Sequence, residues 1–190
     1  MHENQSLTLG RVHRVLNERI RPAIHSDPLP LELSYHVVGG EPIPVAAALI
    51  ADYRPASAGL RWGRAWDTTW FRIRGTVPES QAGRHVEVIA DLGFDVNEPG
   101  FQCEGLVYRP DGVAVRSLNP RAQWIPVGNP VAGGEEVDFF IEAASNPALL
   151  RHPHRFLPSL QGDTDTASPA PLYRVRRVDL CVLEEQVYEL

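Results

Sequence analysis

The sequence contains no lysine, because all 18 of its basic residues are arginine. Enzymes that form a Schiff base on a lysine are therefore excluded, and so are nucleotide-binding proteins that need the P-loop lysine. The Gly-x-Ser-x-Gly, His-Glu-x-x-His and Gly-x-Gly-x-x-Gly motifs are also missing. These three motifs mark serine hydrolases, zinc peptidases and dinucleotide-binding proteins. No active site is recognisable from a local motif.

Cysteine is scarce as well. Cys103 and Cys181 are the only two, and each stands in a strand-like apolar run. We expect buried free thiols and a reducing compartment. No apolar run approaches membrane-spanning length, and no charged-then-apolar leader opens the chain. We therefore expect a cytoplasmic protein. The net charge of -6 argues against nucleic acid or a membrane surface as a partner.

The most informative stretch packs three of the four tryptophans, Trp62, Trp66 and Trp70, into nine residues. From Trp70 to Val77 the side chains alternate, which is typical of a β-strand. Phe71 and Ile73 share one face of this strand and should point into a sheet core. Trp70 lies on the other face, where we expect a helix or loop to bury it.

Further alternating runs are separated by turn signals, and almost no helix lies between them. About eight short antiparallel strands of this kind indicate a β-sandwich or jelly roll. We expect the first and last strands to pair, and a phase shift at Arg176-Arg177 suggests a bulge in the last one. The predicted strands are 31–38, 70–77, 85–91, 101–108, 113–116, 122–127, 137–143 and 172–184.

Ahead of the strands, residues 6–24 carry apolar side chains at helical spacing. This amphipathic helix must lay its apolar stripe on the sheet of this domain or on a surface outside the chain. We divide the chain into a helix and linker at 1–30 and a β-sandwich at 31–190, with a short helix at 46–51 in a crossing loop. The stripe consists of Leu9, Val12, Leu16, Ile20 and Ile24.

Two histidine motifs could in principle hold a metal. His25 and Asp27 have the spacing of a His-x-Asp ligand pair, but a helix exit followed by an Asp-Pro turn explains them better. His152 and His154 flank a proline in a loop, with no third ligand evident, whereas a zinc site needs three or four. A cupin enzyme would need a histidine cluster on adjacent strands, and the predicted strands hold only His36 and His85.

One loop gathers oxygen ligands that calcium accepts, although a solvated acidic loop explains the same residues. Acid pairs for glycosidic cleavage cannot be chosen from 24 acidic residues, because their separation is a property of the fold. The loop residues are Asp91, Asp95, Asn97 and Glu98.

Four motifs give the chain a family resemblance. Trp-Asp-Thr-Thr-Trp-Phe-Arg at 66–72, Glu-Gly-Leu-Val-Tyr at 104–108, Phe-Ile-Glu-Ala-Ala-Ser-Asn at 140–146 and the closing stretch 173–190 occur in that order. In order and spacing they resemble the amino-terminal domain of cytosolic-type family 38 α-mannosidases. The resemblance covers about residues 60–190, and it implies a galactose-binding-like jelly roll.

In that family the catalytic domain follows this region and supplies its own His-x-Asp metal ligands and aspartate nucleophile. The resemblance therefore implies a non-catalytic module that packs on a catalytic domain absent from this chain and contributes to an oligomer. It implies no cofactor here. Zinc or another divalent cation is expected only in the catalytic domain of the parent enzyme, a metal-dependent retaining glycosidase.

A second hypothesis is a stand-alone carbohydrate-binding jelly roll. Trp62 or Trp66 would stack on a sugar ring of a mannoside. Asp67, Glu104 or Asn146 would hydrogen-bond its hydroxyls. Under the first hypothesis the same five residues are candidates for interdomain contacts.

Overall fold

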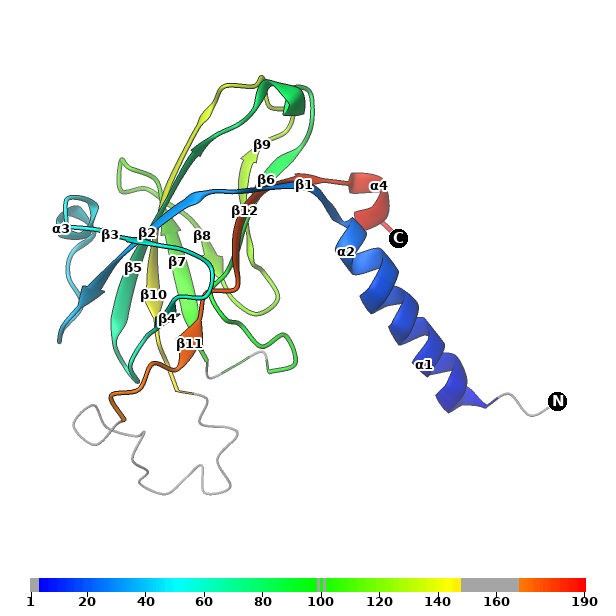
Figure 1. Ribbon diagram of the computed structural model, residues 1–190, viewed down its shortest axis with the longest axis horizontal. Coiled ribbons are helices and arrows are strands. Elements are labelled where there is room, and N and C mark those ends of the chain that lie inside the picture. Colours follow the sequence, from blue (N-terminus) through cyan, green and yellow to red (C-terminus); the bar gives the residue numbers. More distant parts are fainter. Residues whose placement is uncertain (1–3, 99, 101, 148–167) are drawn as a thin grey trace.

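The computed structural model describes residues 4–98, 100, 102–147 and 168–190, and it shows two antiparallel sheets packed face to face (Figure 1). The predicted mostly-β sandwich with an N-terminal helix is confirmed. One sheet has four strands in the order β1-β12-β6-β9, and the other has six in the order β3-β2-β5-β10-β7-β8. A two-stranded ribbon, β11-β4, closes one end. None of the described helices is long and apolar enough to cross a membrane.

The strands of the four-stranded sheet are β1 (His25–Pro30), β6 (Val86–Asp91), β9 (Trp124–Gly128) and β12 (Arg177–Leu183). Those of the six-stranded sheet are β2 (Glu32–Val38), β3 (Arg54–Ala56), β5 (Thr68–Thr76), β7 (Glu104–Tyr108), β8 (Ala114–Leu118) and β10 (Glu136–Ala144). The ribbon pairs β4 (Arg61–Trp62) with β11 (Tyr173–Arg174). The helices are α1 (Gln5–Val15), the π turn η1 (Leu16–Ile20), α2 (Arg21–Ala23), α3 (Val45–Leu49), the 3₁₀ turn η2 (Glu79–Gln81) and α4 (Glu185–Tyr188).

Strand β5 is the centre of the six-stranded sheet. It pairs with β10 along its whole length, from Thr68 to Thr76, and with β2 on its other edge. Phe71 and Ile73 are fully buried in the core between the sheets, opposite residues such as Val88 and Leu180. The predicted direction of these two side chains is confirmed.

The outer face of β5 carries a second, smaller core. Trp70 is fully buried there and stacks on Tyr108 with ring centroids 5.4 Å apart. Helix α3 covers the pair through Ala48, and Tyr53 packs edge-on against Phe140 at 5.7 Å. Burial raises the pKa of the Tyr53 hydroxyl to about 12. The prediction that Trp70 is buried beneath a helix or loop is therefore confirmed, and the helix at 46–51 is α3.

The predicted linker before residue 31 is wrong in part, because residues 25–30 form strand β1. This strand pairs with β12, whereas β2, predicted as the first strand, lies between β3 and β5. Two prolines hide β1 in the sequence, and an edge strand tolerates them because one side of its backbone needs no partner. A register shift between Ser26 and Leu29 adds to the irregularity.

The closing stretch 172–184, predicted as one strand with a bulge, is two strands in two sheets. The chain leaves β11 at Arg174 and enters β12 at Arg177. Between them the Val175 N–H donates to the Leu60 carbonyl and the Arg176 N–H to that of Asp91. The phase shift in the sequence marks this change of sheet.

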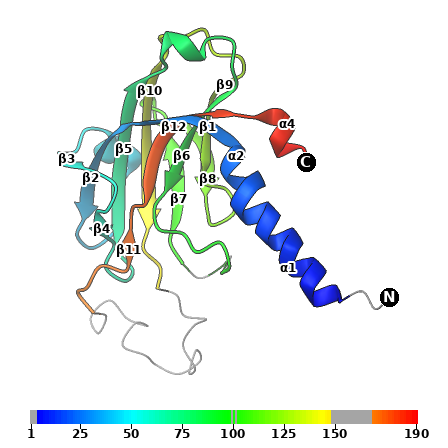
Figure 2. The same cartoon turned by 45° about the vertical axis from the view of Figure 1, so that its right-hand side comes forward.

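The N-terminal helix runs without interruption through α1, η1 and α2 and projects away from the sandwich (Figure 2). Its π turn precedes Pro22, whose missing N–H disturbs the α-helical bonding pattern. No residue of these three segments is buried, and Leu9 is 50% exposed. The N-terminal half of the apolar stripe therefore does not pack on the sheet of this domain.

Replacing Trp70 by alanine should lower the free energy of unfolding by about 3–5 kcal/mol, since it opens a cavity under α3. Domains are stable by only about 5–15 kcal/mol, so the variant should unfold at much lower urea concentration. Trp66→Ala, at a partly exposed ring, is the control and should cost much less. Urea melts followed by circular dichroism measure both. Wild-type stability of the Trp70 variant would contradict the second core.

Candidate functional site

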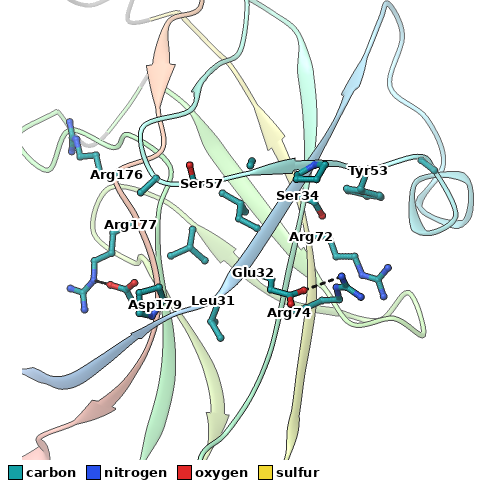
Figure 3. Close-up of a pocket in the computed structure, with 17 residues that line it drawn as sticks. Leu31, Glu32, Ser34, Tyr53, Ser57, Arg72, Arg74, Arg176, Arg177 and Asp179 are labelled. Atoms are coloured by element: carbon teal, nitrogen blue, oxygen red, sulfur yellow. Dashed lines mark hydrogen bonds and ion pairs between the residues drawn. The ribbon is translucent and has the colours of Figure 1, made fainter.

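The first candidate site is a cleft of about 870 Å³ beside strand β2. Figure 3 shows four arginines around it, and we call it the arginine cleft. Arg72 and Arg74 come from the outer face of β5, Arg177 begins β12, and Arg176 directly precedes it. Its base is apolar, formed in part by Leu31 between β1 and β2.

Each arginine of the cleft already holds an acceptor. Arg72 binds Asp138 of β10 through two hydrogen bonds of 2.9 and 2.8 Å, and hydrogen bonding to this carboxylate raises the pKa of the guanidinium. Arg74 binds a Glu32 carboxylate oxygen at 3.0 Å. The remaining two contacts are Arg177 Nε with Asp179 at 2.5 Å and Arg176 Nη1 with the Phe94 carbonyl at 2.6 Å.

This pairing decides what the cleft can do. An anionic ligand would have to displace a carboxylate from a two-point contact such as that of Arg72, and such contacts are strong. A surface of balanced charges over an apolar base is better suited to another polypeptide surface. The arginine cleft is therefore a candidate contact surface and a poor site for a free anion.

The second candidate site lies on the outer face of the four-stranded sheet. His25 of β1 contacts the Glu87 carboxylate of β6 through Nε2 at 3.0 Å. His85 places Nε2 3.8 Å from the other oxygen of Glu87 and binds Glu185 through Nδ1 at 2.7 Å. The sequence did not reveal this cluster, because His25 and Glu87 are 62 residues apart and meet only when β1, β12 and β6 assemble.

The helix-exit turn expected at His25 and Asp27 is wrong. Both residues belong to β1; the His25 ring contacts Glu87, and the Asp27 carbonyl accepts a hydrogen bond from Gln81. His25 is therefore a strand histidine that was not expected, whereas His85, expected in a strand, stands just before β6. Among the described residues, no three His, Cys, Asp or Glu side chains form a group that could hold a metal ion. His152 and His154 lie outside the described residues.

In the acidic loop, carboxylates bind backbone N–H groups of the loop itself. Asp91 accepts from Gly93 at 2.9 Å and from Phe94 at 3.1 Å. Asp95 accepts from Asn97 at 3.0 Å. These bonds give the two carboxylates a structural role in shaping the loop.

Trp62, a predicted sugar or interdomain contact, is not presented by a loop. It belongs to β4, is only 3% exposed and donates its Nε1–H to the Leu92 carbonyl at 2.7 Å. Its ring packs edge-on against Phe71 with centroids 5.1 Å apart. Trp62 is thus a core residue, and its position after a loop rich in proline and alanine hid this in the sequence.

The other four predicted residues gather at one end of the six-stranded sheet, because Ala144 of β10 pairs with both Thr68 and Glu104. Trp66 is 37% exposed, and its φ of 71° is unusual for a residue other than glycine. Ser145 holds that loop, since its carbonyl accepts from the Trp66 N–H and its hydroxyl donates to the Asp67 carbonyl. Asn146 donates to the Gln102 carbonyl at 3.3 Å, while the Glu104 side chain is exposed.

Both cysteines are fully buried free thiols, as predicted. Cys181 belongs to β12, as predicted, whereas Cys103 precedes β7, so its predicted place in a strand is wrong. Burial raises the pKa of both thiols. Neither is suited to act as a nucleophile, since thiolate is the reactive form.

Residues 29–181 match the family described as "Alpha-mannosidase, jelly roll domain". The chain belongs to this family. The jelly-roll domain is 26% identical over 154 residues to human "Alpha-mannosidase 2C1", and the match covers 79% of this chain. A solved structure, "Faecalibacterium prausnitzii Beta-glucuronidase", is similar over 83% of the chain at 14% identity with a TM-score of 0.45. The jelly-roll domain spans 13% of the human protein and 31% of the glucuronidase chain.

In the native jelly-roll domain, Cys103 and Cys181 should not react with Ellman's reagent, because burial keeps both thiols protonated and out of reach. In denaturant without reductant both should react at once, giving two thiols per chain. Rapid labelling of the native protein would contradict the burial, and fewer than two thiols after unfolding would indicate a disulfide.

Proposed function

We propose that the chain is the non-catalytic N-terminal domain of a larger α-mannosidase and packs against the catalytic domain of that enzyme. The family match and the short share of human α-mannosidase 2C1 that the chain spans support this. Zinc or another divalent cation then belongs to the catalytic domain. The parent enzyme cleaves terminal α-mannose, and the domain acts in the cytoplasm.

The observation that carries the packing proposal is the N-terminal helix. It projects from the sandwich, and Leu9 and Val12 of its stripe are exposed (Figure 1). Isolated helices of this kind gain most of their stability from packing of an apolar face. The catalytic domain is the partner we assign to this face, since most of the length of the related mannosidase lies outside the jelly-roll region.

The arginine cleft offers a second contact surface of different character. Its paired charges need no ligand of opposite sign, so a neighbouring domain can cover it without leaving a charge unpaired. The helix would supply apolar area and the cleft would supply polar complementarity.

The test places one charge on the stripe. Leu9→Asp in the full-length enzyme should lower its melting temperature, since the carboxylate would be buried between the domains. Leu7→Asp is the matched control, because Leu7 is 61% exposed and two residues away, about 200° around the helix. Calorimetry of both variants and of the wild type makes the comparison.

Equal melting temperatures for the Leu9 and Leu7 variants would contradict docking through the stripe. Gel filtration of the same proteins tests whether the stripe instead joins subunits of an oligomer. A change of oligomeric state with unchanged domain packing would assign the stripe to contacts between subunits instead.

The isolated chain should hydrolyse no aryl α-mannoside, with or without added zinc, because the described residues supply no metal-binding group and both cysteines are buried. Release of nitrophenol from an aryl α-mannoside measures this. Turnover that survives purification and disappears in a point mutant of this chain would show that the domain is itself catalytic.

A further inference from the structure

A groove of about 820 Å³ runs across the outer face of the four-stranded sheet, and we call it the outer-sheet groove. Glu87 and His85 line its floor at β6, and Trp124 of β9 forms a wall. Arg121 and Arg21 stand among the exposed residues that line it. The groove lies beside α2 and α4, which both views place at the same end of this sheet (Figures 1 and 2).

The floor of the groove presents two polar atoms, Oε1 of Glu87 and Nε2 of His85, that do not bond to each other. Since an ionised carboxylate can only accept, His25 must donate through Nε2 to Glu87, and His85 must donate through Nδ1 to Glu185. The other ring nitrogen of His85, Nε2, lies 3.8 Å from Oε1 of Glu87, which is too long for a hydrogen bond. A ligand hydroxyl suits both atoms, because it can donate to the carboxylate oxygen and can donate to or accept from the ring nitrogen.

An aromatic wall stands beside these two polar atoms. Glu87 is paired with Pro126 and Ile89 with Trp124, so Trp124 and Glu87 are diagonal neighbours on adjacent strands, about 7 Å apart. Arg116 covers one face of the indole, with Cζ 4.1 Å from the ring centroid, and it does not line the groove. The ring therefore meets the groove with the side that Arg116 leaves uncovered.

Charge decides between ligand classes. Glu87 is 5% exposed at the floor and would repel an anion. Arg21 and Arg121 would repel a cation that approaches the groove. A neutral ligand rich in hydroxyl groups avoids both penalties, because each hydroxyl donates one hydrogen bond and accepts others.

We propose that the outer-sheet groove binds a pyranose sugar, with adjacent hydroxyls hydrogen-bonded to Glu87 Oε1 and His85 Nε2 and the ring packed on Trp124. This site differs from the sequence-predicted one around Trp66, which is at the end of the other sheet. It does not depend on packing against a catalytic domain.

The test is a titration of the complete chain with methyl α-mannopyranoside by calorimetry or ligand-observed NMR. We expect weak binding, with a Kd of about 1 mM, as is common for one small ring with few anchors. 2-Methoxytetrahydropyran, which keeps the ring and lacks the hydroxyls, should not bind. Trp124→Ala should weaken mannoside binding by about tenfold or more.

Trp66→Ala is the matched control and should leave the Kd within about twofold of the wild type. A thermal melt of each variant checks folding. If Trp124→Ala is unstable, His85→Ala decides, because it removes one of the two polar contacts at a partly exposed position and should also weaken binding. The proposal is overturned if the wild type binds no mannoside, if the tetrahydropyran binds equally well, or if the folded variants bind like the wild type.

Discussion

Strand β5 buries large apolar side chains on both of its faces, and the rest of the sandwich is arranged around the need to cover them. On its inner face, Phe71 and Ile73 require the four-stranded sheet, which supplies residues such as Val88 and Leu180. On its outer face, Trp70 requires α3 and Tyr108. A strand covered on one side only would leave either the main core or the indole in water. The crossing loop between β2 and β5 therefore cannot be treated as a passive connection, because it carries the cover of Trp70.

The sequence predicted those features that depend on local alternation. The faces of β5 and the sandwich class follow from a period of two, which any half-buried strand must show. Strand β1 was not predicted, because an edge strand with two prolines shows no such period and forms only by pairing with the distant β12. The division of 172–184 between two sheets escaped for a related reason, since alternation does not say which sheet a strand joins.

The candidate site was harder to predict from the sequence than the fold. The position of Trp62 and Trp66 ahead of a strand suggested that a loop would present them to a ligand, yet Trp62 belongs to the ribbon and donates to the Leu92 carbonyl. Trp124 lines the outer-sheet groove, but it stands inside a predicted strand and was not predicted as a site residue. The cluster of His25, Glu87 and His85 joins strands that are neighbours only in the folded sheet. A sequence lists residue types, whereas a binding groove is a property of register between strands that are distant in the chain.

The pairing of β1 with β12 has a mechanical consequence. His25 at the beginning of β1 lies opposite Leu183 at the end of β12, so helix α1 and helix α4 leave the sheet at the same corner. A tension applied between these two helices would pull across the ladder and break its hydrogen bonds one after another, as in a zipper. Force applied along the strands would instead have to break all the hydrogen bonds of the ladder together. The corner at which the two helices meet is therefore the point where force would open this domain first.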